Sequence, residues 1–231
     1  EMKREELLKT AKPILFNSEM VKAILEDRKT VTRRVIKTEL SEFLGFGYDW
    51  VSKDKAVFGF SKYGHLEAFK PRYQVGDILY VRETWGDYTY DEPNGSAAYY
   101  VYYRADYEDG VKTYIHPQKD DCGEEIVCDL PKWKPSIHMP KDAARIFLKV
   151  TNVRVERLKE ITYEGCISEG ITDDYKTYSE EYHDNLARRA YPVIFSDLWN
   201  STINKQDLDE YGWEANPYVW VIEFERVEVE V

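Results

Sequence analysis

The sequence contains no hydrophobic run long enough to cross a membrane as a helix. A spanning helix needs about 18 or more consecutive apolar residues, and no stretch of the 231 residues approaches that length. The first twelve residues, EMKREELLKTAK, are charged and lack the apolar core of a secretory signal peptide. We therefore expect a cytoplasmic protein with no membrane partner.

Cysteine is scarce, and its count is odd. Three cysteines, Cys122, Cys128 and Cys166, in a chain without an export signal argue against a disulfide framework. The spacing of Cys122 and Cys128 is longer than in zinc knuckles, although His116 and His138 flank the pair and could complete a metal site. Reduced thiols in a polar loop are the favoured interpretation, so we predict no metal and no cofactor.

Positive charge is also in deficit. The 32 lysines and arginines are outnumbered by 43 acidic residues, which gives a net charge of −11. Binding to long nucleic acids depends on cationic side chains that neutralise phosphates, so a role in coating nucleic acid is disfavoured. A basic pocket for one nucleotide or nucleoside remains compatible with this composition.

Aromatic residues, by contrast, are abundant at 15% of the chain, with 19 tyrosines. Tyrosine-rich stretches such as SAAYYVYYRAD are typical of strands in a sheet or barrel wall. Alternatively, some of the rings stack on a planar ligand. Composition leaves both interpretations open.

The first third of the chain predicts a strand, a helix and a second strand. The apolar run 13–16 indicates the first strand, and Ser18 is placed to cap a helix that ends near Asp27. The segment 30–37, TVTRRVIK, is rich in β-branched residues and predicts the next strand. We expect an irregular segment with one hairpin over 39–73.

The second of these strands places two polar side chains on one face. Side chains alternate along a strand with period two, so Thr32 and Arg34 share a face. Lys29 immediately precedes the strand and can lean over the same face. The question is whether this charged corner is solvated or forms one wall of a pocket.

The remaining chain predicts further strands and three helices. A buried strand over 78–81 is followed by polar and aromatic residues at its end, and one clear strand is expected within 87–131. Thr162 and Gly170 bracket a short helix. Two later helices are expected to separate at Pro192, and the segment from 216 to the end predicts a central strand that is covered on both faces.

These elements do not alternate strictly between strand and helix, which argues against a doubly wound parallel sheet. The pattern favours an α+β fold with a small mixed β-barrel and helices packed on it. No repeat, low-complexity tract or clear linker divides residues 1–231, so we expect a single domain.

Several segments in the correct order resemble the ASCH superfamily, whose members have a PUA-like barrel. The segments are MVKAILEDRKTVTRRVI (20–36), VGDILYVRETW (75–85) and ERLKEITYEGCISEGI (156–171). The fuller pattern, with WKPSIHMPKDAARI (133–146) and NPYVWVIEF (216–224), is similar to longer ASCH proteins of phages and of bacterial genomes that carry phage genes. The resemblance implies insertions over about 39–73, 87–130 and 172–212.

The smallest ASCH proteins include amidohydrolases that remove the acetyl group from acetylcytidine. Their reactive lysine and threonine lie in an RKTxTxR segment, which corresponds here to residues 28–34, and their glutamate lies in the later short helix. The resemblance thus implies Lys29, Thr32 and Glu169 as catalytic residues, with Arg34 as an inward-facing arginine.

Amide hydrolysis requires a nucleophile, a base and donors for the developing oxyanion. Thr32 would attack or orient a water, Lys29 would act as base once burial lowers its pKa, and Glu169 would pass a proton to the leaving amine. Six side chains are candidate substrate contacts, with the tryptophans as stacking surfaces: Arg34, Arg82, Glu83, Trp85, Trp133 and His138.

The same residues also have structural explanations. Arg28 and Lys29 complement the dipole at a helix C-terminus, and a threonine in a strand or an acid in a last helical turn is ordinary. Two functions therefore stay open, and in both the partner is a small nucleoside or a modified base in nucleic acid. One is an amidohydrolase acting on an acylated nucleoside, and the other is a PUA-like module that binds RNA or a modified base without turnover. A ribonuclease activity, also associated with ASCH domains, is less compatible with the acidic composition.

Overall fold

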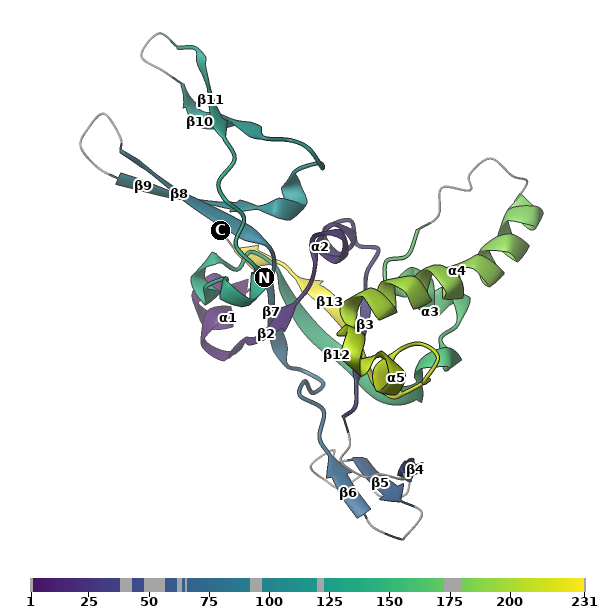
Figure 1. Ribbon diagram of the computed structural model, residues 1–231. Coiled ribbons are helices and arrows are strands. Elements are labelled where there is room, and N and C mark those ends of the chain that lie inside the picture. The colour runs from purple at the N-terminus through teal and green to yellow at the C-terminus, as the bar shows by residue number, and fades with distance from the viewer. Residues whose placement is uncertain are drawn as a thin grey trace. The chain divides into compact units, whose positions relative to one another are not determined.

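The computed structural model describes residues 2–37, 43–47, 57–61, 64, 66–91, 97–119, 123–172 and 180–230 (Figure 1). The chain divides into two compact units, each made from segments that are distant in sequence. The first unit comprises Glu1–Glu26, Ile78–Leu148 and Arg226–Val231, and the second comprises Asp27–Asp77 and Lys149–Glu225. Each is described by itself.

The first unit is built from short strands and hairpins with two helices. Its elements are β1 (Met2–Lys3), α1 (Arg4–Thr10), β2 (Lys12–Leu15), α2 (Ser18–Leu25), β7 (Ile78–Arg82), β8 (Trp85–Asp91), β9 (Ala97–Tyr103), β10 (Thr113–Lys119), β11 (Glu125–Asp129) and β14 (Val229–Glu230), with 3-10 turns η2 (Arg104–Asp106), η3 (Ser136–His138) and η4 (Lys141–Ala143). The strands β2 and β7 pair in parallel, and β8 with β9 and β10 with β11 form antiparallel hairpins.

The second unit combines long strands with the longest helix. Its elements are β3 (Val31–Val35), β4 (Phe43–Gly47), β5 (Val57–Ser61), β6 (Leu66–Phe69), most of β12 (Phe147–Arg157), α3 (Tyr163–Ser168), α4 (Glu180–Thr202), α5 (Leu208–Tyr211) and most of β13 (Tyr218–Val227), with 3-10 turns η5 (Leu158–Glu160) and η6 (Lys205–Asp207). Strands β4, β5 and β6 form a separate three-stranded antiparallel sheet.

The main sheet has five strands in the order β2-β7-β12-β13-β3. It is mixed, because β2 and β7 are parallel whereas β13 and β3 are antiparallel. The predicted α+β class is therefore confirmed. Closure into a barrel requires the first and last strands to pair, and among the described residues no pairing joins β2 to β3, so the expected barrel is not seen there.

Strand β13 is central and buried on both faces, as predicted. It lies between β12 and β3, and Val219, Val221 and Ile222 are all at most 2% exposed. Strand β3 pairs with it in the register Thr32 to Ile222 and Arg34 to Trp220. One face of this pair packs against the helices in a core made of the buried residues Val31, Leu158, Ile161, Cys166, Ile171, Tyr191, Phe195, Trp199, Val219 and Val221.

The short helix α3 lies beside α4 (Figure 1) and is fixed at both ends by the residues that the sequence indicated. The Thr162 side chain accepts a hydrogen bond from the backbone N–H of Gly165 at its start. Gly170 follows its end with φ +92°, a conformation that glycine adopts at little cost. The helix therefore stops at a defined residue and presents Glu169, its C-cap, to the start of β3.

The backbone joins these two segments directly. The N–H of Thr30 donates to the carbonyl of Ser168 at 2.9 Å, and Lys29 and Glu169 form an isolated antiparallel bridge. Because both ends of the contact are backbone, the relative position of the two segments does not depend on side-chain rotamers.

Two sequence predictions about the helices are wrong in detail. Helix α4 continues through Pro192 instead of breaking there, because Tyr191, Phe195 and Trp199 keep one continuous buried stripe and the tertiary packing outweighs the lost hydrogen bond. The side-chain cap of α2 is Asn17, which accepts from the Met20 N–H at 2.8 Å, and not Ser18.

Strand content was also underestimated. The segment expected to hold one hairpin contains the three strands β4, β5 and β6, and the segment 87–130 contains two hairpins where one clear strand was expected. Short strands of this kind pair locally and carry little apolar alternation, so periodicity alone does not reveal them.

The cap of α3 yields a stability prediction. We expect Thr162→Ala to lower the free energy of unfolding by about 1 kcal/mol, because the Gly165 N–H loses its acceptor, whereas Thr162→Ser, which retains the hydroxyl, should stay close to wild type. Urea denaturation monitored by circular dichroism measures both variants. Equal stabilities for the two variants would show that the cap contributes nothing.

Candidate functional site

Lys29 and Glu169 form a buried contact in the second unit. Nζ of Lys29 donates to Oε2 of Glu169 at 2.5 Å and to the Glu169 backbone carbonyl at 2.9 Å. The side chains are 0% and 4% exposed. The resemblance to the ASCH superfamily implied roles for these two residues, which are 140 positions apart, and the fold brings their charged groups together.

Arg33 binds the other oxygen of the same carboxylate. Its Nη1 donates to Oε1 of Glu169 at 3.1 Å, while Nε and Nη2 donate to Oε1 of Glu156 at 2.9 and 2.6 Å. The Arg33 side chain is 2% exposed and lies 5.8 Å from the centre of the Phe195 ring. Glu169 is therefore held from two sides, and its orientation is fixed.

Thr32 and Arg34 lie on the opposite face of β3 from Arg33, as the alternation of the strand requires. Nη1 of Arg34 donates to Oγ1 of Thr32 at 2.8 Å and to the carbonyl of Arg33 at 3.0 Å. Thr32 is 1% exposed. A guanidinium that donates to a hydroxyl oxygen stabilises negative charge on that oxygen, as a threonine nucleophile requires.

Burial dominates the electrostatics of the site. It lowers the pKa of Lys29 below its ordinary value, the adjacent Glu169 carboxylate opposes this change, and the positive charges of Arg34 and Arg33 add to the lowering. Burial likewise lowers the pKa of Arg34. A lowered lysine pKa increases the share of the neutral amine, which is the form that can accept a proton.

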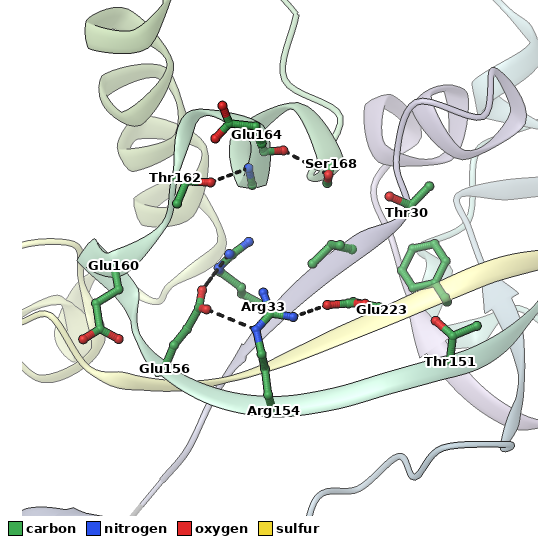
Figure 2. Close-up of a pocket in the computed structure, with 13 residues that line it drawn as sticks. Thr30, Arg33, Thr151, Arg154, Glu156, Glu160, Thr162, Glu164, Ser168 and Glu223 are labelled. Atoms are coloured by element: carbon green, nitrogen blue, oxygen red, sulfur yellow. Dashed lines mark hydrogen bonds and ion pairs between the residues drawn. The ribbon is translucent and has the colours of Figure 1, made fainter.

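Two hollows flank β3. One, which we call the acid-lined hollow, has a volume of about 410 Å³ and is lined by Thr30, Val31, Arg33, Thr151, Arg154, Glu156, Glu160, Thr162, Glu164, Gly165, Ser168, Glu223 and Phe224. Figure 2 shows Arg33 directed toward Glu156, and Arg154 paired with Glu223 across the strands that floor the hollow.

The second, which we call the Arg34 hollow, has a volume of about 370 Å³. It lies on the Thr32 face, because Arg34, Trp220 and Ile222 belong to the same side of the β3–β13 pair. Its full lining is Arg34, Val35, Ile36, Lys37, Phe69, Lys70, Pro71, Arg72, Tyr73, Trp220 and Ile222. Arg34 thus connects this hollow to the Thr32 hydroxyl.

The structure brings together Lys29, Thr32, Arg34 and Glu169, all within the second unit. The remaining five candidate residues lie in the first unit. There Glu83 is 1% exposed and its carboxylate accepts from Nε and Nη2 of Arg145 at 2.9 and 3.0 Å. This arrangement satisfies a buried acid and gives Glu83 a structural explanation.

The other first-unit candidates have local partners. Arg82 donates to the carbonyl of Ile137. Trp85 is buried, and Nζ of Lys134 lies 4.7 Å from the centre of its ring. The ring centres of Trp133 and Tyr107 are 5.8 Å apart. His138 is exposed in η3. Their assignment as substrate contacts stays a prediction.

Sequence reasoning assigned no role to Arg33 or Glu156, although Arg33 donates to Glu169 and is itself held by Glu156. The alternation rule placed Arg33 on the face away from Thr32, and nothing in the sequence shows that a carboxylate from α3 reaches around the end of the strand. Trp220 and Tyr73 were missed as pocket residues for a similar reason, since their position depends on strand pairing and on the chain after β6.

Within the described residues, no group of three or more His, Cys, Asp or Glu side chains is arranged to hold a metal ion. Cys122 lies outside these residues, and the described cysteines Cys128 and Cys166 form no disulfide. Burial raises the pKa of the Cys166 thiol to about 12, so this thiol stays protonated at neutral pH. In the same part of the chain no helix is long and apolar enough to span a bilayer.

The buried ion pair yields a second prediction. Lys29→Met should lower the free energy of unfolding by about 3–5 kcal/mol, because it leaves the Glu169 carboxylate buried with one cation fewer. The double variant Lys29→Met/Glu169→Gln should recover part of that loss, since no lone charge remains. A double-mutant cycle from urea denaturation measures the coupling.

The matched control is the exposed pair Lys149–Glu225, whose side chains are 52% and 59% exposed. We expect Lys149→Met to change stability by less than about 0.5 kcal/mol, as is usual for surface ion pairs. If Lys29→Met lowered the free energy of unfolding by no more than Lys149→Met does, the buried pair would not be a structural constraint.

No family model, curated protein or solved structure matches this chain.

Proposed function

We propose that this protein is a PUA-like amidohydrolase of the ASCH type that removes an acyl group from a modified, cytidine-like nucleoside. Lys29, Thr32 and Glu169 would carry the reaction. The observation that carries the proposal is the buried 2.5 Å contact between Nζ of Lys29 and Oε2 of Glu169, because it joins the two titratable groups that the ASCH-like segments single out.

The contact supplies a complete proton cycle without an external group. At rest, the pair holds one mobile proton, as ammonium and carboxylate. Transfer of this proton across the contact would give a neutral amine and a carboxylic acid, and burial lowers the pKa of Lys29, which favours the neutral amine. The neutral Lys29 amine can then take the hydroxyl proton of Thr32.

Acyl transfer follows from this state. Oγ1 of Thr32 forms a bond to the acyl carbon, the carbon–nitrogen bond breaks, and the departing amine takes the proton held by Glu169. Lys29 is then an ammonium and Glu169 a carboxylate, which restores the resting charges. A water molecule releases the acyl group from Thr32 by the same exchange, with the proton of Glu169 returning to Oγ1.

Arg34 supports the nucleophile. Its hydrogen bond to Oγ1 at 2.8 Å stabilises the oxygen as it loses its proton. The same geometry is compatible with Thr32 orienting a water that attacks directly, in which case no acyl-enzyme forms. Trapping with mass spectrometry separates the two routes, since only the first adds an acyl group to Thr32.

A second function is favoured by one observation. The Lys29 side chain is 0% exposed and Thr32 is 1% exposed, so neither group faces open solvent. A module that binds a modified base without turnover needs no access to them, and the ion pair then serves stability alone. Incubation with acetylcytidine distinguishes the functions, because a binding module retains the ligand without releasing acetate.

A third prediction compares two neighbouring threonines. Thr32→Val should lower kcat/KM for acetylcytidine by a factor of about 10² or more, because it removes the hydroxyl and leaves a side chain of similar shape. Thr30→Val is the matched control, since Thr30 is exposed and lines the acid-lined hollow instead. Acetate release measured by chromatography tests both variants, and circular dichroism verifies their folding.

Equal activity of the two threonine variants would exclude Thr32 from the reaction. The absence of acetate release from the wild-type protein, across a panel of acylated nucleosides and their 5′-monophosphates, would exclude the amidohydrolase itself.

A fourth prediction concerns pH. The reaction needs the one proton that the Lys29–Glu169 pair holds, so kcat/KM should fall about tenfold per pH unit once the pair loses it. Because burial lowers the pKa of Lys29, this fall should begin below the ordinary lysine pKa of about 10.4. A profile of kcat/KM from pH 6 to 11, from which the background rate of the Thr32→Val variant is subtracted, measures this fall. A rate that still rises through pH 10 would contradict the proton cycle.

A further inference from the structure

The Arg34 hollow is positively charged in a protein that is strongly acidic. Four of its lining residues are cationic, namely Arg34, Lys37, Lys70 and Arg72, and none of its described lining residues is an aspartate or a glutamate. The whole chain carries a net charge of −11. A local excess of cations around one hollow therefore distinguishes it from the general composition.

The acid-lined hollow provides the contrast. It has two arginines, Arg33 and Arg154, and four glutamates, Glu156, Glu160, Glu164 and Glu223. Its arginines are paired with these acids, as Figure 2 shows for Arg33 with Glu156 and Arg154 with Glu223. An anion placed there would meet net negative charge, whereas an anion in the Arg34 hollow would meet none from the lining residues.

The cations of the Arg34 hollow are arranged so that a ligand can reach them. Lys37, Lys70 and Arg72 are exposed, while Phe69, Tyr73 and Trp220 are buried and supply aromatic wall. Cationic side chains over an aromatic wall suit a ligand with a phosphate and a planar ring. The volume of about 370 Å³ falls within the range of small-molecule sites, roughly 300–1,000 Å³.

The hollow is also connected to Thr32, one of the proposed catalytic residues. Arg34 lines it and donates to Oγ1 of Thr32, and Trp220 and Ile222 pair across from Arg34 and Thr32 on the same face. A ligand in the hollow would therefore lie on the Thr32 side of β3, and not on the Arg33 side.

We propose that the Arg34 hollow binds the phosphate of a mononucleotide, so that the substrate is a 5′-phosphorylated nucleoside and not the neutral nucleoside. The identification as substrate rests on the function proposed above, but the binding of a mononucleotide does not. A single nucleotide is preferred to a polymer because a chain with a net charge of −11 repels a continuous phosphate backbone.

The test is isothermal titration calorimetry of the full chain with three unacylated probes: cytidine, cytidine 5′-monophosphate and inorganic phosphate. At low salt, the monophosphate should bind at least about tenfold more tightly than cytidine, equivalent to about 1.4 kcal/mol. Raising the salt to about 0.5 M should remove most of this difference, because exposed charges are screened. Inorganic phosphate should compete with the monophosphate and not with cytidine.

The variant Lys70→Ala/Arg72→Ala should lose the tenfold preference while its affinity for cytidine stays unchanged. The matched control is Lys149→Ala/Arg154→Ala, which removes two partly exposed cations of the same unit outside the Arg34 hollow, and it should retain the preference. Equal affinities of wild type for cytidine and its monophosphate, or an equal loss in both double variants, would overturn the proposal.

Turnover separates this inference from the proposed function. If the monophosphate binds in the Arg34 hollow but neither acetylcytidine nor its 5′-monophosphate releases acetate, the nucleotide site stands and the amidohydrolase is excluded. If both substrates release acetate with the same kcat/KM and bind equally, the amidohydrolase stands and the phosphate site is excluded.

Discussion

The contact between Lys29 and Glu169 is the interaction on which the candidate site depends. Two opposite charges are removed from water, and their desolvation is offset only if each is closely paired and hydrogen-bonded. Glu169 meets this condition with Lys29 at one oxygen and Arg33 at the other. A buried pair of this kind fixes the end of α3 against the start of β3 and keeps both charged groups out of water.

Strand β3 divides the chemistry of the second unit into two sides. Arg33 points toward the helices and joins Glu156 and Glu169, whereas Arg34 points toward Thr32 and the Arg34 hollow. Adjacent arginines thus have different roles because strand side chains alternate. One binds the Glu169 carboxylate, and the other connects the Thr32 hydroxyl to the Arg34 hollow. Alternation therefore places two arginines that are adjacent in sequence on opposite faces of β3, one beside Glu169 and the other beside the Arg34 hollow.

The two hollows differ in charge more than in size. Their volumes are about 410 and 370 Å³. In the acid-lined hollow the arginines are paired with glutamates, whereas the described lining residues of the Arg34 hollow include four cations and no acid. Charge distribution, and not volume, is therefore the property that distinguishes the two hollows. The same distribution places four cations around one hollow of a protein with a strong acidic excess.

The sequence by itself determined local features that depend on neighbouring residues. It fixed the alternation of Thr32 and Arg34, the ends of α3 at Thr162 and Gly170, and the central, doubly buried character of β13, because caps, turns and periodicity act over a few positions. The proposed resemblance to the ASCH superfamily also pointed to Lys29 and Glu169. These features need no knowledge of the rest of the fold.

Only the tertiary structure decided which distant residues meet. The pairing of Lys29 with Glu169, the reach of Arg33 to Glu156, and the presence of Trp220 beside Arg34 all depend on strand register and on where α3 ends in space. Helix α4 runs through Pro192 because a buried stripe outweighs a local penalty, which no local rule reveals. Long-range contacts are chosen by packing and desolvation summed over the whole unit, and for this reason the sequence named the residues while the fold assembled them.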